Sequence, residues 1–161
     1  MTQEGISISL DPIVRVDRSI RPSYPDDWVR NVLEPQLELS GPAEYSLSTI
    51  EQLMHPNQQK DIYVSGNVIY FDLREMKALA LCLNLQDCFA IQKKGIAIFR
   101  NFFAGNAIFF WALVVVHRNE MDICVPYLVD RGGDKAILGW TWLRDRWLPS
   151  STALLFCKKE N

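Results

Sequence analysis

Three apolar segments rich in β-forming residues follow one another in the last third of the chain and restrict its fold more than any other feature. They read AIFFWALVVVH, MDICVPYLV and KAILGWTWL, and the stretch between the second and third contains Gly132 and Gly133. Two adjacent glycines are typical of a tight hairpin turn, because both central positions can need a positive φ. Pro126 has no amide donor, so either its strand is bulged or the order of the meander is imperfect there. The segments therefore predict an antiparallel β-meander, to which the run 153–157 can add a fourth strand.

The glycine pair also predicts which residues face each other across the second hairpin. A two-residue turn places Trp140 opposite Val125 and, two residues further on, Trp142 opposite Ile123. Aromatic rings pair well with β-branched neighbours. In this register one sheet face carries no charge and needs a cover, so both tryptophans are expected in the core. The opposite face is uneven, with a depression expected where small Gly139 lies between larger neighbours.

Signals for helices concentrate in the middle of the chain. Asp72 and Glu75 have the spacing of a capping box, and apolar residues follow at helical intervals. Asn84 can cap a second helix, which Gly95 closes. The segment 96–104 predicts a third, short helix. These helices are the available cover for the charge-free sheet face.

The first third of the chain, residues 1–66, holds most of the prolines and alternates short apolar segments with turns. The segment IVRVDRSI predicts an exposed strand. Asp26 can cap a short helix, and Ser48 with Glu51 has the capping-box spacing of another. His55 lies at the end of this second helix, where an imidazole can bond the last carbonyls.

Together these patterns predict a single α+β domain, which suits a chain of 161 residues with 48% apolar side chains. Irregular segments and short helices occupy residues 1–66, helices occupy 67–105, and an antiparallel sheet of three to four strands occupies 106–157. The N-terminal segments and the helices pack on the C-terminal sheet.

The composition argues against several classes of partner. The net charge is -2, too small to draw the whole molecule to nucleic acid. A nucleic-acid site would require five basic residues to converge on one face: Lys93, Lys94, Arg100, Arg144 and Arg146. The N-terminus lacks the pattern of a signal peptide, and the most apolar tract, of ten residues, is too short to cross a bilayer. We therefore expect a cytoplasmic protein with no membrane or nucleic-acid partner.

The spacing of the cysteines indicates neither a metal site nor a disulfide framework. The chain has four, with no CxxC pair among them or with the two histidines: Cys82, Cys88, Cys124 and Cys157. We expect reduced, buried thiols. No cofactor and no metal ion is indicated.

The stretch GWTWLRDRW, residues 139–147, has the strongest ligand-binding character in the chain. The guanidinium groups of Arg144 and Arg146 beside the Trp147 indole can hold a carboxylate or phosphate. Trp111, on the uneven sheet face, is added to this candidate site. The alternative is that the arginines form a solvated turn and Trp147 covers the core.

One histidine is expected beside a carboxylate. His117 faces Asp122 across the first predicted hairpin, and Glu120 lies in the same turn. A carboxylate that holds one imidazole nitrogen is what a general base needs. However, an ordinary cross-strand pair gives the same pattern, and no nucleophile or metal ligand is expected nearby.

The function predicted from these features is non-catalytic. The chain contains no GxSxG, HExxH or phosphate-loop motif. We expect a module that binds a small molecule or a protein, on the uneven sheet face or beside the segment 144–147. A small hydrolase that uses His117 with Asp122 is the alternative.

Overall fold

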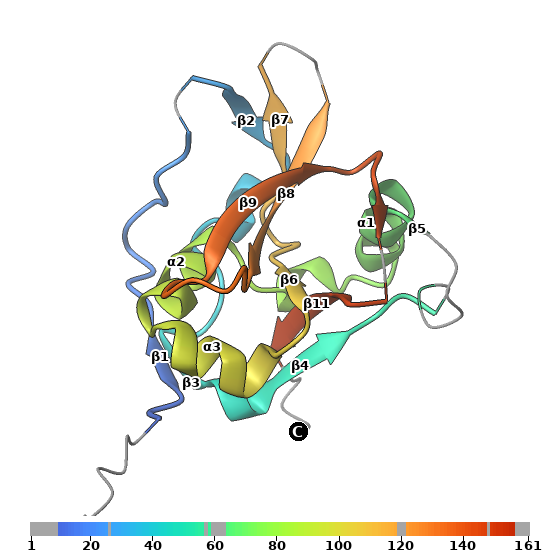
Figure 1. Cartoon of the computed structure of the whole chain (residues 1–161). Coiled ribbons are helices and arrows are strands. Elements are labelled where there is room, and N and C mark those ends of the chain that lie inside the picture. Colours follow the sequence, from blue (N-terminus) through green and yellow to red (C-terminus); the bar gives the residue numbers. More distant parts are fainter. Residues whose placement is uncertain are drawn as a thin grey trace, which may run out of the picture.

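The centre of the fold is a seven-stranded mixed sheet (Figure 1). The computed structural model describes residues 10–25, 27–56, 58, 64–118, 122–147 and 149–156. Within these residues the strand order is β2 (Val29–Val32), β7 (Val115–His117), β8 (Ile123–Val129), β6 (Ala107–Phe109), β11 (Ser151–Phe156) and β4 (Ile50–Leu53), and β9 (Ile137–Trp142) pairs with the other edge of β8. The pairing of β6 with β11 is parallel, and the remaining pairs are antiparallel.

The predicted α+β fold, with a C-terminal antiparallel meander of three to four strands, is wrong. Two strands from the N-terminal third, β2 and β4, form the two ends of the sheet, and β6 pairs in parallel with β11. Both N-terminal strands lie where the sequence predicts short helices. Ser48, the predicted cap, instead lies inside a 3-10 turn, η2 (Leu47–Thr49), and donates its amide hydrogen bond to Ser46, which caps that turn. Long-range pairing then makes the following residues a strand.

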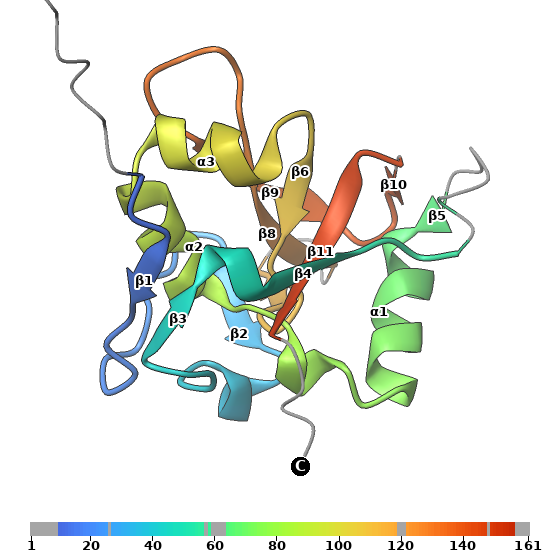
Figure 2. The same cartoon turned by 90° about the horizontal axis from the view of Figure 1, so that it is seen from below.

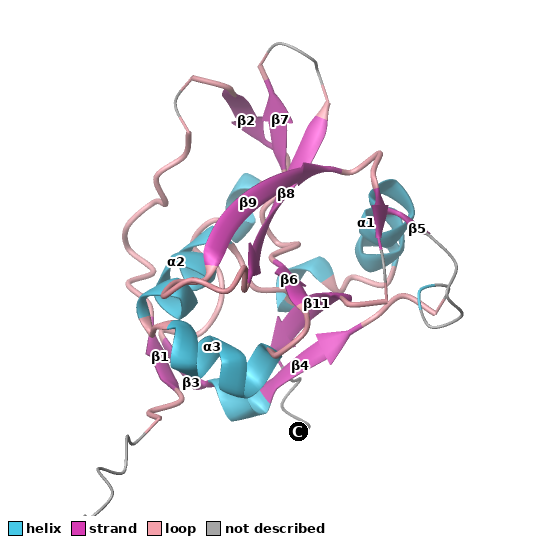
Figure 3. Ribbon diagram, in the orientation of Figure 1, coloured by secondary structure: helices cyan, strands magenta, loops and turns pink. Residues whose placement is uncertain are grey.

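Three α-helices of the described chain cover the two faces of the sheet. Figures 2 and 3 show α2 (Leu85–Lys93) and α3 (Ile96–Phe103) on one side and α1 (Gly66–Glu75) on the other. The predicted capping of α2 by Asn84 is confirmed. The predicted helix start at Asp72 is wrong, because Asp72 lies in the last turns of α1. Lys77, with φ of 56°, ends that helix, and a 3-10 turn, η4 (Leu79–Leu81), follows.

Both faces of the sheet are buried, which explains why its C-terminal segments are apolar without strict alternation. On one face, residues of α2 and α3 form a hydrophobic cluster with Cys124 and Leu128. On the other, residues of α1 form a second cluster with Val125. Most of the uneven face predicted as a binding surface is therefore interior. Its expected depression is filled by Tyr127, whose Cζ atom lies 2.5 Å from the point that a Cβ of Gly139 would occupy.

The register of the first predicted hairpin is confirmed, and that of the second is shifted by one residue. β7 and β8 pair as predicted, and the amide of His117 donates to the carbonyl of Asp122 at 2.7 Å. In the second hairpin Trp140 lies opposite Pro126 instead of Val125. Since side chains alternate between the two faces of a strand, the shift moves both tryptophans of β9 to the face of α2 and α3. There they pack, partly buried, against the first cluster.

The shift arises because the loop between β8 and β9 is not a two-residue turn. Gly132 has φ of 86°, but Gly133 does not have a positive φ. Asp130 accepts a hydrogen bond from the amide of Gly132, and Arg100 donates both to Asp130 and to the carbonyl of Gly133. A side chain from α3 thus shapes the turn.

Pro126 explains why the first β-rich segment divides into β6 and β7. The amide of Phe110 donates to the carbonyl of Pro126 at 3.0 Å. In a regular ladder the carbonyl of Phe110 would accept from the amide of residue 126, but proline has none. That carbonyl instead accepts from the amide of Leu113 in a turn. The chain then returns to β8 in a new register.

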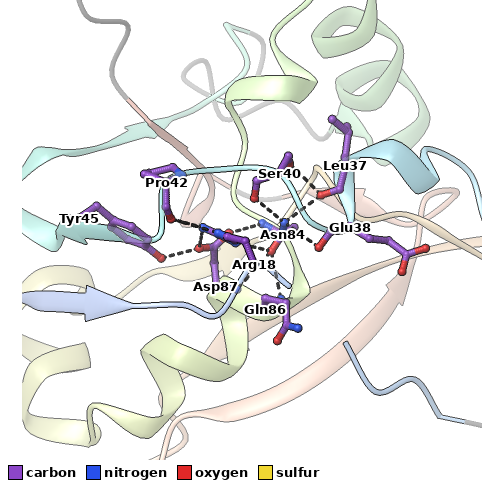
Figure 4. Close-up of polar contacts among 9 residues, drawn as sticks. All are labelled: Arg18, Leu37, Glu38, Ser40, Pro42, Tyr45, Asn84, Gln86 and Asp87. Carbon is purple, nitrogen blue, oxygen red and sulfur yellow. Dashed lines mark hydrogen bonds and ion pairs between the residues drawn. The ribbon is translucent and has the colours of Figure 1, made fainter. Parts of the chain in front are cut away.

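A buried polar network joins the N-terminal third of the chain to α2 (Figure 4). Asp87, in the first turn of α2, is fully buried. Its Oδ1 atom accepts from Nη2 of Arg18 and from the hydroxyl of Tyr45, both at 2.7 Å. Its Oδ2 atom accepts from the amide of Asn84 at 2.9 Å. Arg18 also donates to the carbonyl of Pro42.

Asn84 extends this network into the loop between η1 (Pro35–Leu37) and β3 (Glu44–Ser46). Its side-chain amide donates to the carbonyls of Leu37, Glu38 and Ser40. β3 in turn pairs with β1 (Ile13–Arg15), a strand that the sequence predicts. The N-terminal segments are therefore bound to α2 through a few buried side chains.

Arg18→Ala should destabilise the protein strongly, because it leaves a buried carboxylate without its cation. We expect a loss of about 3 kcal/mol or more in the free energy of unfolding, measured by urea denaturation. Burial raises the pKa of Asp87, and Arg18 opposes this rise. The loss should therefore shrink as the pH falls, since a protonated Asp87 needs no counter-charge. Arg15→Ala is the control: it removes an exposed pair with Glu44 and should cost under about 1 kcal/mol. Equal losses in both variants would contradict the assignment.

The buried thiols should resist alkylation. Cys82, Cys88 and Cys124 are buried, as expected, while Cys157 lies outside the described residues. Burial raises the pKa of Cys82 to about 12, so its reactive thiolate is scarce at pH 8. Iodoacetamide should leave Cys82 and Cys88 unmodified in the native protein and alkylate both in urea, as read by peptide mass spectrometry. Native alkylation at the rate seen in urea would refute this.

Candidate functional site

A cavity of about 580 Å³ lies beside α1, between this helix, the end of β4 and the start of β11. We call it the α1 cavity. Its apolar walls come from α1, from β4 with the residues that follow it, and from the aromatic side of the second cluster: Ile69, Leu73, Met76, Leu53, Met54, Pro56, Trp111, Trp147 and Ala153. Its polar lining consists of His55, Gln58, Asp72, Glu75 and Ser151. Its volume and its few polar groups are typical of small-molecule sites.

Two indoles form the aromatic wall of the α1 cavity. The ring centroids of Trp111 and Trp147 lie 5.5 Å apart. Trp147 belongs to β10 (Arg146–Trp147), which pairs with β5 (Val64–Ser65) just before α1. Only 2% of Trp147 is exposed. Its ring passes so close to Gly66 that a Cβ there would lie 2.4 Å from its Cζ3 atom. The first residue of α1 therefore has to be small for this wall to form.

A histidine and an aspartate supply a polar pair in the cavity lining. Nε2 of His55 and Oδ2 of Asp72 are 2.5 Å apart. The His55 side chain is 13% exposed and that of Asp72 is 43% exposed, so the pair is reached from solvent through the aspartate. The sequence-based role of His55, bonding the last carbonyls of a short helix, is wrong because the preceding residues form β4.

Gln58 fixes the chain that carries His55. Its Oε1 atom accepts from the amide of His55 at 2.8 Å, and its Nε2 atom donates to the carbonyl of Ser151 at 2.8 Å. Gln58 is almost completely buried. The histidine is thereby fastened to the start of β11, on the opposite side of the cavity from α1.

The pairing of His55 with Asp72 is not apparent from the sequence, because the two residues come from separate elements. One signal was available. Asp72 lies on the same helical face as Ile69, Leu73 and Met76, which line the cavity with it. A carboxylate within an apolar helical face indicates a specific polar contact.

Of the four binding residues predicted from the sequence, the structure brings the two tryptophans together and places the two arginines elsewhere. Trp111 and Trp147 are brought together in the α1 cavity. Arg146 precedes Trp147 in β10 and is exposed, because successive side chains of a strand point in opposite directions. Arg144 lies elsewhere: its Nη1 atom is 2.6 Å from Oδ2 of Asp122, and its guanidinium lies 4.9 Å from the ring centre of Trp142.

The predicted catalytic candidates also have other partners. Both carboxylate oxygens of Asp122 are engaged, one by the amide of Ile123 at 2.9 Å and the other by Arg144. The ring of His117 stacks on Trp28 with centroids 5.3 Å apart. Glu120 lies outside the described residues.

The basic residues that a nucleic-acid site would need are largely paired with acids. Lys94 lies 3.3 Å from Asp11, and Arg100 lies 2.7 Å from Asp130. Arg144 is paired with Asp122 as described above. Three of the five charges are therefore locally neutralised, which weakens any long-range attraction to phosphates.

Comparisons do not extend these observations. No protein-family model, curated protein or solved structure matches the chain. None of the helices in the described ranges has the length and apolar character needed to span a bilayer. Among the same residues, no group of three or more His, Cys, Asp or Glu side chains is placed to hold a metal ion.

Gly66→Ala tests the construction of the aromatic wall. The added methyl group would meet the Trp147 ring and the carbonyl of Leu143, so we expect a loss of about 1–3 kcal/mol in the free energy of unfolding. Gly133→Ala is the matched control, because a Cβ there has no neighbour within 4 Å. Urea denaturation of both variants measures the difference. An unchanged Gly66→Ala variant would show that Trp147 is not held against α1.

Proposed function

We propose that the chain is a non-catalytic module that binds a small, largely apolar molecule in the α1 cavity. The observation that carries this proposal is a cavity of about 580 Å³ with apolar walls, two adjoining indoles and one histidine–carboxylate pair. In such sites apolar contact provides most of the affinity, and a few polar groups orient the ligand.

The lining also indicates the shape of the ligand. An apolar body fits against Trp111, Trp147 and the apolar face of α1. A polar head group fits beside His55, whose ring is held in one orientation by Asp72. A molecule with one polar end and one apolar end satisfies both parts of the cavity.

Other functions have less support. A small hydrolase built on His117 and Asp122 would need the aspartate to orient the imidazole, but Arg144 and a backbone amide engage its carboxylate. A protein partner spread over the uneven sheet face would need a wide open surface, and helices cover most of that face. A cytoplasmic location is part of our proposal, and the buried thiols of Cys82 and Cys88 support it.

The binding of 1-anilinonaphthalene-8-sulfonate, a fluorescent probe with an apolar body and one polar group, tests the proposal. We expect saturable binding with one site per chain, followed by probe fluorescence. Met76→Glu should weaken this binding about tenfold, because it places a negative charge on the apolar wall, where it repels the sulfonate of the probe. Met76 is 68% exposed, so the substitution should leave the stability nearly unchanged.

Phe71→Glu is the matched control for this experiment. It adds the same charge to the same helix at a position that is 60% exposed and does not line the cavity. The probe should bind this variant as it binds the parent protein. Equal weakening by both substitutions, or no saturable binding to the parent protein, would overturn the proposed function.

A further inference from the structure

A second recess lies at the end of the sheet where β2, β7, β8 and β9 meet, on the face opposite the α1 cavity. Its volume is about 410 Å³, and its lining is Asp27, Trp28, His117, Cys124, Trp140 and Trp142. We call it the aromatic recess. It contains three of the five tryptophans of the chain and shares none of its residues with the α1 cavity.

The rings of this recess form walls at large angles to one another. Trp28 and Trp140 stand nearly perpendicular, with an interplanar angle of 85° and centroids 5.2 Å apart. His117 stacks on Trp28, and Trp142 lies 5.1 Å from His117 at 48°. All four rings are only partly buried. Tryptophans that are only partly buried lose part of the hydrophobic stabilisation that full burial would give.

The second observation is the negative charge of Asp27 in the lining of the recess. Asp27 is exposed and lines the recess, and it forms no ion pair with another described residue. The π face of an indole attracts cations, most strongly among the aromatic side chains. Three indoles beside one unpaired carboxylate are therefore complementary to a positive charge. We propose that the aromatic recess binds a methylated or quaternary ammonium group.

A neighbouring contact within the protein follows the same chemistry. The guanidinium of Arg144 lies 4.9 Å from the ring centre of Trp142, so this indole already holds one cation. Arg144 does not line the recess, and Asp122 neutralises it at 2.6 Å. Its charge therefore does little to repel a second cation bound between the rings.

The lining favours an alkylated ammonium over a primary one. A primary ammonium is strongly hydrated and needs several hydrogen-bond acceptors when it leaves water. The recess offers the carboxylate of Asp27 at its edge and otherwise mainly ring surfaces. A group whose charge is covered by methyls loses less hydration and gains more contact with the indoles.

The experiment follows the indole N–H signals of ¹⁵N-labelled protein by NMR during titration with choline, with sodium chloride as the ionic-strength control. Single Trp→Phe variants assign the signals. We expect saturable shifts for Trp28, Trp140 and Trp142, and none for Trp111 and Trp147. The neutral isostere 3,3-dimethyl-1-butanol should bind at least about tenfold more weakly, because it lacks the charge. Equal binding of the isostere would overturn the proposal, and so would shifts confined to Trp111 and Trp147 or no saturable shifts.

Two variants distinguish the contributions of charge and ring. Asp27→Asn should weaken choline binding about threefold, and Trp140→Phe about twofold to fivefold. Asp134→Asn, an exposed change outside the recess, is the matched control and should have no effect. If Trp140→Phe perturbs the fold, Asp27→Asn still tests the site, since it alters only an exposed side chain. Unchanged affinity in Asp27→Asn would overturn the role of the carboxylate.

The same ammonium chemistry occurs in free small molecules and in trimethylated lysine side chains. A trimethyl-lysine peptide and free trimethyl-lysine, titrated in parallel, separate these sources. Tighter binding of the peptide assigns the site to a modified protein, and equal binding assigns it to a small molecule. Binding of neither would overturn the proposal. Because the signals of Trp111 and Trp147 report the α1 cavity separately, failure here leaves the proposed function unaffected.

Discussion

Asp87 carries a charge in the interior, and the arrangement of the N-terminal third depends on how that charge is compensated. Arg18, Tyr45 and the amide of Asn84 donate to its two oxygens (Figure 4). Each donor comes from a different part of the chain, so the carboxylate is satisfied only when these parts are assembled together. A buried charge left unpaired is far more costly than an unpaired surface charge. The network therefore favours one arrangement of β1, β3 and α2.

Once these segments are in place, helices cover both faces of the sheet, and the positions open to a ligand are few. Val125 and Leu128 both lie on β8 but belong to clusters on opposite faces. The recesses occur at margins, where this cover ends. The α1 cavity lies beside one helix, and the aromatic recess lies at the end of β8 and β9. Each recess is lined by tryptophans, and the lining of each includes a carboxylate.

The sequence predicts only part of each candidate site, because the residues of a site come from separate elements. Trp111 and Trp147 are recognisable as unusual residues, and the structure brings them together. Arg144 and Arg146 are equally recognisable, but strand alternation and an ion pair with Asp122 separate them from Trp147. His55 and Asp72 come from different elements, and their approach depends on how β4 and α1 pack. Trp28 reaches the recess only because its segment pairs with β7.

The sequence by itself determined the features that depend on neighbouring residues: the capping box of Asn84 and Asp87, the helix over 96–103, the first hairpin and the interruption caused by Pro126. The tertiary structure alone decided that β2 and β4 are strands, that β6 pairs in parallel with β11, and that the second hairpin is shifted by one residue. Capping and turn signals act over a few residues. A strand is completed by distant donors and acceptors, and a one-residue shift in pairing exchanges the faces of every side chain. In the loop of the shifted hairpin, Arg100 of α3 donates to the carbonyl of Gly133.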